Sequence, residues 1–198
     1  MHPVHLHVTY VERQSRLTTF FRYFLLIPHA IVSALWAIPV YFITIGAWFA
    51  ILVTGSYPKG MWEFSARWLR YTARVNCFGV LLADGFPPFE GDSPYPVMAT
   101  IDRQERLSRL TTFFRTLVAI PAWVILYVMA VCGNVVAFVL WWVIMITGRS
   151  PKGMHGFLVT VQRYNVRTSA YLLLLTDRYP SFELAPDQVE GAQLTSSG

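Results

Sequence analysis

Two long apolar runs dominate the pattern of hydrophobic and polar positions along the chain. The first covers residues 23–54 and the second residues 116–147, and neither contains Asp, Glu, Lys or Arg. Each run is about 32 residues long, well beyond the roughly 18 apolar residues that indicate a membrane-spanning helix. Each is too long for one comfortable crossing of a hydrocarbon core ~30 Å thick, and slightly short for two without flanking residues.

An amphipathic segment follows each run, at residues 60–82 and 153–175. In the first, Arg67, Arg70 and Arg74 recur at spacings of three and four among aromatic and aliphatic positions. This spacing predicts amphipathic helices that lie in the membrane interface. Outside the helices, residues 4–10 alternate between apolar and polar positions as a strand would, which predicts a small cytoplasmic β-ladder joining two repeats.

The chain is an internal duplication with a constant offset of 93 residues. The string RLTTFFR at 16–22 recurs unchanged at 109–115, and the same offset carries Asp84 onto Asp177. A gap-free duplication of this length predicts two copies of one structural unit, related by pseudo-symmetry. We therefore expect a first repeat at 1–95, a second at 96–184 and a disordered tail at 185–198.

The distribution of charge favours a helical hairpin in each repeat. Basic residues both precede and follow each apolar run, and a hairpin returns both groups to one side of the membrane, as the positive-inside rule expects. Helix breakers near the middle of the runs, Pro39 and the pair Gly133 and Asn134, mark the bend. The predicted crossings cover 17–38, 40–54, 111–131 and 135–147, with both termini in the cytoplasm.

Composition supports a membrane protein of this kind. The chain is 55% hydrophobic and 14% charged, with a mean hydropathy of +0.43, a balance that fits poorly with a water-exposed surface. We therefore expect an all-α polytopic membrane protein. The net charge is +5, but the basic residues lie beside apolar runs, which predicts anionic lipid head groups as partners and no nucleic acid. Cys77 and Cys132 have no CxxC spacing, so no metal or disulfide is expected.

Several segments together resemble a known family. They are Arg109-Leu110, Ile120-Pro121, the turn TGRSPKG at 147–153 and the stretch SAYLLLLTDRYPSF at 169–182. This arrangement resembles a bacterial membrane family catalogued as domain of unknown function 4389, and both repeats match it. The first repeat departs from the pattern at 83–87, where ADGFP stands in place of TDRYP. The resemblance implies a multi-pass protein of the bacterial inner membrane and supplies no chemistry.

Basic side chains beside the apolar runs are the candidate site residues, because long cationic side chains reach lipid phosphates from the ends of membrane helices. An arginine buried between helices would instead mark a functional or assembly site, because an intramembrane charge is costly. We expect contact with lipid head groups or a protein partner at Arg22, Lys59, Arg70, Arg74, Arg115, Lys152, Arg163 and Arg167.

No motif for catalysis or cofactor binding is found in the chain. The turns at 54–61 and 147–154, with the pattern TGxxPKGM, contain Gly, Lys and a hydroxyl group as a phosphate-binding loop does. However, no strand precedes them, and Pro interrupts each turn. A helix C-cap followed by a turn is therefore the favoured interpretation. No catalytic, cofactor-binding or metal-binding residue is predicted.

Two functional hypotheses follow from these observations. The first is a nonenzymatic accessory or scaffold subunit of a larger membrane complex, because bulky side chains dominate the runs and few polar groups are present to line a pathway. The alternative is a small channel or transporter built from the duplicated halves as an oligomer. With two crossings per repeat, the halves would be parallel and related by an axis along the membrane normal.

Overall fold

The computed structural model describes residues 2–89, 95–104 and 106–180. Each copy contributes one strand, one long helix and one shorter helix, so the duplication seen in the sequence is also a duplication of structure. The tail at 185–198, predicted to be disordered, lies outside the described residues. The elements are β1 (Val4–Val8), α1 (Arg16–Thr54), α2 (Lys59–Gly79), β2 (Val97–Ile101), α3 (Arg109–Thr147) and α4 (Lys152–Leu172).

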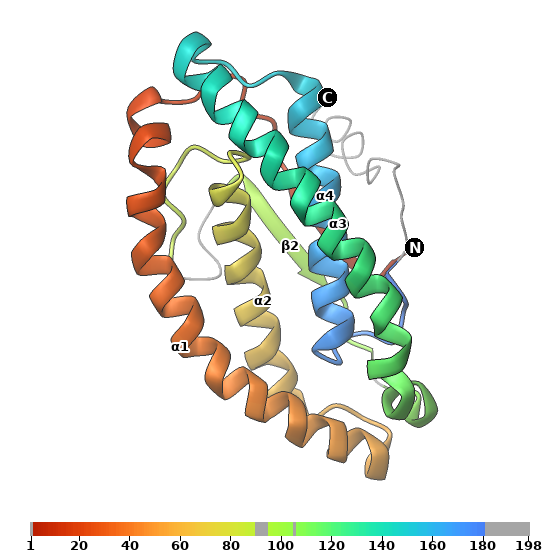
Figure 1. Ribbon diagram of the computed structural model, residues 1–198. Helices are drawn as coiled ribbons and strands as arrows, with labels where there is room; N and C mark the ends of the chain where they lie inside the picture. The colour runs from red at the N-terminus through yellow and green to blue at the C-terminus, as the bar shows by residue number, and fades with distance from the viewer. Residues whose placement is uncertain (1, 90–94, 105, 181–198) are drawn as a thin grey trace, which may run out of the picture.

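The two apolar runs form continuous helices, so the prediction of a hairpin in each repeat is wrong. Helix α1 and helix α3 each contain 39 residues without a break. Pro28, Pro39 and Pro121 lie inside these helices with exposed side chains. A proline on the outer face bends a helix away from itself without ending it, and α1 curves around α2 in Figure 1. The four predicted crossings therefore reduce to two helices that are long and apolar enough to span a membrane.

The ends of the long helices are set by capping residues that recur in both copies. Ser15 is the N-cap of α1, and its side chain accepts a hydrogen bond from the backbone N–H of Thr18 at 3.4 Å. At the other end Gly55 adopts a left-handed conformation, with φ of 76°, which glycine accepts without steric cost. Pro58 then precedes α2. The sequence prediction of a helix C-cap and turn is confirmed here.

Helices α1 and α3 run antiparallel, and each end of one meets the opposite end of the other (Figure 1). The indole N–H of Trp48 donates to the carbonyl of Thr112 at 3.1 Å, and that of Trp141 donates to Thr19 at 3.0 Å. The pseudo-twofold axis therefore passes across the long helices. The expectation of parallel repeats, which followed from the hairpins, is wrong for the same reason.

Backbone hydrogen bonds close both junctions between the copies. The N–H of Leu107 donates to the carbonyl of Gly55 at 3.0 Å, and the N–H of Gln14 donates to Gly148 at 3.2 Å. These donors lie just before the long helix of one copy, and the acceptors cap the long helix of the other. Each glycine cap is therefore also the docking point for the opposite repeat.

Helices α2 and α4 lie between the long helices and the two strands. They were predicted at 60–82 and 153–175 as interfacial helices; their positions are confirmed to within about three residues, but they are central elements of the fold. Helix α2 contacts α1, α4 and β2, and α4 contacts α3, α2 and β1. Their amphipathic character therefore reflects packing between an apolar layer and a strand layer.

The predicted β-ladder is present, with its second strand at Val97–Ile101. The strands β1 and β2 are antiparallel, and Leu6 pairs with Ala99 at the centre of the register. Those two residues are 93 positions apart, the offset of the duplication. The pseudo-symmetry axis therefore passes through the middle of the ladder.

We predict that Gly55→Ala lowers the free energy of unfolding by about 1–2 kcal/mol, the cost of a left-handed residue with a Cβ. Chemical denaturation in detergent measures the change. Gly60→Ala is the matched control, because nothing lies within 4 Å of the added methyl group and Gly60 is helical. Equal stabilities of the two variants would contradict the capping role of Gly55.

Candidate functional site

The guanidinium group of Arg22 is buried where α1 meets the end of α2; only 1% of the residue is exposed. Its Nη1 donates to the carbonyl oxygens of Phe78 and Ala83, the latter at 2.9 Å. The group also lies 4.4 Å from the centre of the Phe78 ring and 3.6 Å from a carboxylate oxygen of Asp84. Arg22 thus donates to one carbonyl of the last turn of α2 and to one in the segment that follows it, where a cation is favourable.

The contact is reciprocal, because Asp84 serves the start of α1. Its Oδ2 accepts a hydrogen bond from the backbone N–H of Ser15 at 3.0 Å, and a carboxylate at a helix N-terminus is favourable. We call this arrangement the arginine clamp of the first copy: Arg22, Asp84 and the backbone groups that they cap. It ties the beginning of α1 to the end of α2.

The second copy contains the same clamp, formed by Arg115 and Asp177. Nη1 of Arg115 donates to the carbonyls of Tyr171 and Thr176, Nη2 pairs with Asp177, and Asp177 accepts from the N–H of Ser108. Arg22 and Arg115 were predicted to contact lipid head groups or a protein partner. In the structure both side chains are buried, and their partners are backbone carbonyls and side chains of the same repeat.

Two further predicted arginines, Arg74 and Arg167, are also buried. Nε of Arg167 donates to the carbonyl of Val4 at 3.4 Å, and Nε of the half-buried Arg163 donates to Leu6 at 3.2 Å. These contacts bring α4 against β1 and satisfy backbone acceptors of a strand edge. Arg74 and Arg167, predicted to contact lipid or a protein partner, are therefore buried inside the fold.

The remaining predicted residues keep access to the surface. Lys59 and Lys152 are exposed at the first residues of α2 and α4, and Arg70 is half-buried. Nζ of Lys59 lies 4.0 Å from Glu63, and Nζ of Lys152 lies 5.9 Å from the centre of the Tyr10 ring. Contact with lipid head groups or a protein partner stays a prediction for Lys59, Arg70, Lys152 and Arg163.

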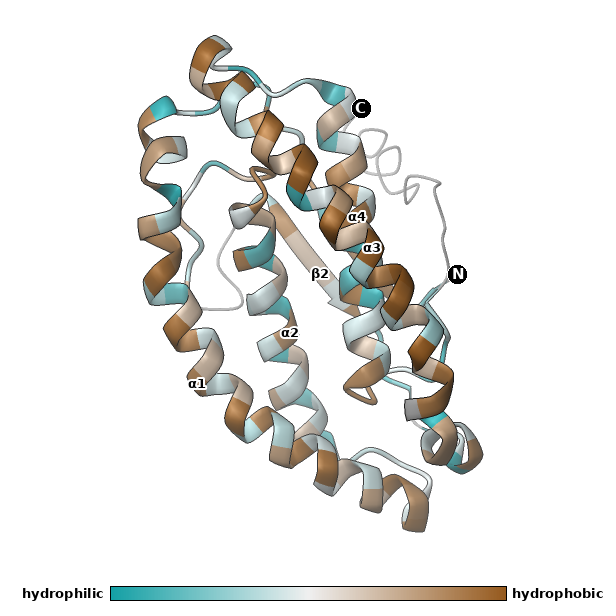
Figure 2. Ribbon diagram, viewed as in Figure 1, coloured by the Kyte–Doolittle hydropathy of each residue, from teal (hydrophilic) through white to brown (hydrophobic). Residues whose placement is uncertain are grey.

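The outer faces of α1 and α3 are covered with exposed apolar side chains, and Figure 2 shows hydrophobic residues along both helices. Within the most apolar part of each helix, only 17% of α1 and 11% of α3 is buried. The core helix of a water-soluble protein would be mostly buried. The exposed side chains include Phe24, Ile31, Phe42, Phe49, Leu117, Trp123, Tyr127, Phe138 and Trp142.

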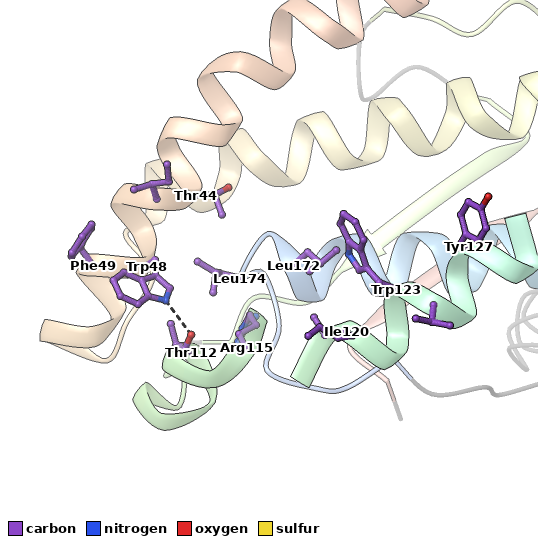
Figure 3. Close-up of a pocket in the computed structure, with 13 residues that line it drawn as sticks. Thr44, Trp48, Phe49, Thr112, Arg115, Ile120, Trp123, Tyr127, Leu172 and Leu174 are labelled. Atoms are coloured by element: carbon purple, nitrogen blue, oxygen red, sulfur yellow. Dashed lines mark hydrogen bonds between the residues drawn. The ribbon is translucent and has the colours of Figure 1, made fainter. Parts of the chain in front are cut away.

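A lateral pocket of about 880 Å³ opens on this apolar face, between the second half of α1 and the first half of α3. Figure 3 shows Trp48 and Phe49 on one side, Trp123 and Tyr127 on the other, and Leu174 between them. Arg115 reaches the inner end of the pocket, where its Nη groups are engaged in the clamp. The pocket is therefore lined almost entirely by apolar surface.

A basic groove lies one turn away from the lateral pocket. It has a volume of about 510 Å³, and its lining includes Arg106, Arg109, Thr54 and Ser56. Arg109 precedes the pocket residue Thr112 by three positions on α3, which places it one helical turn beyond the pocket. The described residues that line this groove include no acidic side chain.

A third depression, the central cleft, lies between the two copies and has a volume of about 660 Å³. Its described lining carries no charged side chain but several neutral polar ones, among them Asn76, Asn134, Gln162 and Ser169. Gln162 is 94% buried, and its Oε1 has no hydrogen-bond partner among the described residues. Gly133 allows α3 to approach α4 here, because an added Cβ would lie 3.2 Å from Val161.

Sequence reasoning missed Arg106, Arg109, Trp123 and Gln162 as lining residues of these depressions. The available signal was a difference between the copies: Trp123 stands where the first copy has Ala30, and Gln162 stands where it has Leu69. Residues kept in both copies mark the shared fold, whereas residues that differ alter the surface of one half. Candidate residues were sought among the arginines kept in both copies, and such residues belong to the shared fold.

Comparison with known proteins places the chain in a family. The model of the family described as Domain of unknown function (DUF4389) matches residues 16–90 and again residues 109–183. The two matches cover most of the chain, and the chain belongs to this family. No curated protein and no solved structure matches the chain.

We predict that Arg115→Met lowers the free energy of unfolding by about 3–5 kcal/mol, the usual result of removing one partner from a buried ion pair. The carbonyls of Tyr171 and Thr176 lose the guanidinium donor in the same variant. Arg67→Met, on the exposed side of α2, is the control and leaves the unfolding midpoint nearly unchanged. If both variants unfold at the same denaturant concentration, the clamp does not stabilise the fold.

Proposed function

We propose that this member of the DUF4389 family is a nonenzymatic, membrane-embedded scaffold or accessory subunit of a larger membrane complex. The observation that carries the proposal is the exposed apolar surface of α1 and α3, which no part of the described chain covers. Lipid acyl chains cover most of this surface, and a partner protein covers the rest. Exposed basic groups near the helix ends contact anionic head groups.

The size of the apolar surface supports the proposal. Soluble monomers rarely expose a contiguous apolar patch larger than a few hundred Å², and each large side chain gains ~1.5–3 kcal/mol when it leaves water. Both faces carry many such side chains and no charge between residues 23 and 54 or between 116 and 147. A surface with this composition is stable in contact with hydrocarbon.

The lengths of the helices indicate how they lie. A charge-free stretch of about 32 residues extends ~48 Å at 1.5 Å per residue, against a hydrocarbon core ~30 Å thick. We therefore propose that α1 and α3 are strongly inclined to the membrane normal. Basic residues flank both ends of the antiparallel pair, with Arg13 and Arg149 at one end and Lys59 and Arg106 at the other. Location in a bacterial inner membrane, with cytoplasmic termini, stays a prediction.

A scaffold role also agrees with the use made of the buried charges. Three of the buried arginines, Arg22, Arg115 and Arg167, hold helix ends and a strand together, as described for the clamps and for β1. The guanidinium groups of Arg22, Arg115 and Arg167 donate to backbone carbonyls of the same chain, and those of Arg22 and Arg115 also lie beside a carboxylate. The proposed role therefore rests on shape and surface rather than on a reactive group.

A channel or transporter is the second candidate, and the central cleft favours it. In transporters built from repeats, polar sites lie at the interface between the halves. This cleft contains Gln162, whose buried side-chain oxygen has no hydrogen-bond partner within the described part of the chain. Because α1 and α3 are antiparallel, such a transporter would have inverted repeats. The cleft offers neutral groups, so its solute would be a small uncharged molecule that donates hydrogen bonds.

We predict that Cys132 reports the embedding of α3. Its side chain is exposed within the charge-free stretch, so an apolar maleimide labels it in intact vesicles and a charged maleimide does not. Cys77 stays unlabelled, because burial raises the pKa of its thiol to about 12 and keeps it protonated. Arg67→Cys on the Cys132→Ala background is the positive control. Equal labelling of Cys132 and Arg67→Cys by the charged reagent would contradict embedding.

One preparation decides between the two functions. We expect mild extraction into nanodiscs, followed by mass spectrometry, to recover a second protein in fixed stoichiometry, as a scaffold requires. The same protein, reconstituted alone into liposomes, should give no flux of urea or glycerol above that of empty vesicles. A lone chain with flux that Gln162→Leu abolishes and Asn165→Ala lowers, since both residues line the cleft, would overturn the scaffold in favour of the transporter.

A further inference from the structure

We propose that the lateral pocket and the basic groove together hold one anionic phospholipid. An acyl chain occupies the pocket between α1 and α3, and the phosphate group lies against Arg106 and Arg109. This inference rests on the proposed membrane location. It adds a stoichiometric lipid at a defined place, which a protein surrounded by bulk lipid does not require.

The pocket has the chemistry of an acyl-chain site. Its lining combines rigid aromatic walls with aliphatic side chains of α3 and α4, and its volume of about 880 Å³ is within the ~300–1,000 Å³ typical of small-molecule sites. The pocket opens on the apolar face, so a chain can enter from the hydrocarbon core without crossing water. Its polar end is fixed by the hydrogen bond from Trp48 to the carbonyl of Thr112.

The groove has the chemistry of a phosphate site. Two guanidinium groups, of Arg106 and Arg109, line a groove that also contains hydroxyl groups of Thr54 and Ser56. Guanidinium groups bind phosphate oxygens in pairs of parallel hydrogen bonds. Nε of Arg109 lies 3.5 Å from where a Cβ on Gly55 would be, so its charge is held next to the left-handed turn.

The relative position of the two parts matches a phospholipid. Arg109 and Thr112 are one turn apart on α3, and Phe49 of the pocket precedes Thr54 of the groove by five residues on α1. A ligand that follows the junction of α1 and α3 therefore passes from apolar to basic surroundings over about one turn of helix. Head group and acyl chain of one lipid have this separation, whereas free phosphate would use the groove alone.

The opposite end of the molecule provides an internal comparison. There Leu26 stands at the position of Ala119, with Cδ1 3.5 Å from where a Cβ on Gly79 would be, and Ala30 stands at the position of Trp123. The first copy thus lacks the Trp wall and fills space with Leu26.

Native mass spectrometry of delipidated protein tests the proposal, with phosphatidylglycerol and phosphatidylcholine offered in equal amounts. We expect one phosphatidylglycerol retained per chain, and retention reduced about tenfold in the variant Arg106→Gln/Arg109→Gln, because two charge-assisted contacts are lost. The pseudo-equivalent variant Arg13→Gln/Arg16→Gln retains the lipid. Melting temperatures of both variants establish that each is folded.

A second variant separates the acyl pocket from the groove. Trp123→Ala reproduces the residue of the first copy at an exposed position, and we expect it to weaken retention of phosphatidylglycerol while leaving folding intact. Equal retention by the two double-arginine variants, or equal retention of phosphatidylcholine, would overturn the lipid site. Displacement of the lipid by inorganic phosphate at low concentration would also overturn it. If Cys132 is at the same time protected from charged reagents, the proposed membrane location stands without the lipid site.

Discussion

The fold depends on a buried guanidinium group at the end of a helix. Arg22 and Arg115 each lie in a place where desolvation of a cation is costly, and that cost is offset because each guanidinium group donates to buried backbone carbonyls and pairs with a carboxylate. The carbonyls lie in the last turn of α2 or α4 and in the segment after it, and the carboxylate also caps the start of the long helix. Each clamp therefore joins two helix ends in one contact, and it fixes the angle at which the shorter helix returns along the longer one.

The clamps hold the helices of each copy together, and the junctions hold the two copies together. One copy alone cannot cover both sides of its central helix. Helix α2 contacts α4 and β2, and α4 contacts α2 and β1, so each central helix packs against elements of the other copy. The other copy provides the missing surface, and the contacts between opposite ends of α1 and α3 hold the two copies together. The two copies differ at residues that line the depressions: Trp123 stands against Ala30, and Gln162 against Leu69. The framework of helices and strands is therefore pseudo-symmetric, whereas the residues that line the depressions differ between the copies.

Sequence reasoning predicted the duplication, the extents of α2 and α4, and the ladder, because these depend on local periodicity and on an offset that is visible in the letters. It did not predict continuous long helices, because a proline such as Pro39 interrupts or only bends a helix according to the face on which it lies. It also expected Arg22 and Arg115 to contact lipid head groups or a protein partner, and did not predict their contacts within the chain. Their principal partners are backbone carbonyls far along the chain, and such acceptors leave no mark in a sequence. The lateral pocket was invisible for a related reason, since it exists only where two helices from different copies meet.

The register of the ladder has a consequence for how such a chain arose. Leu6 pairs with Ala99, its own counterpart in the other copy, so each strand forms hydrogen bonds with the strand that corresponds to itself. Two separate identical chains would satisfy the same geometry, because an isologous contact needs the same surface on both subunits. The segment between α2 and β2 only has to bring the second strand back beside the first. The architecture is therefore that of a homodimer joined into one polypeptide. In a single chain, the two halves need not remain identical in sequence.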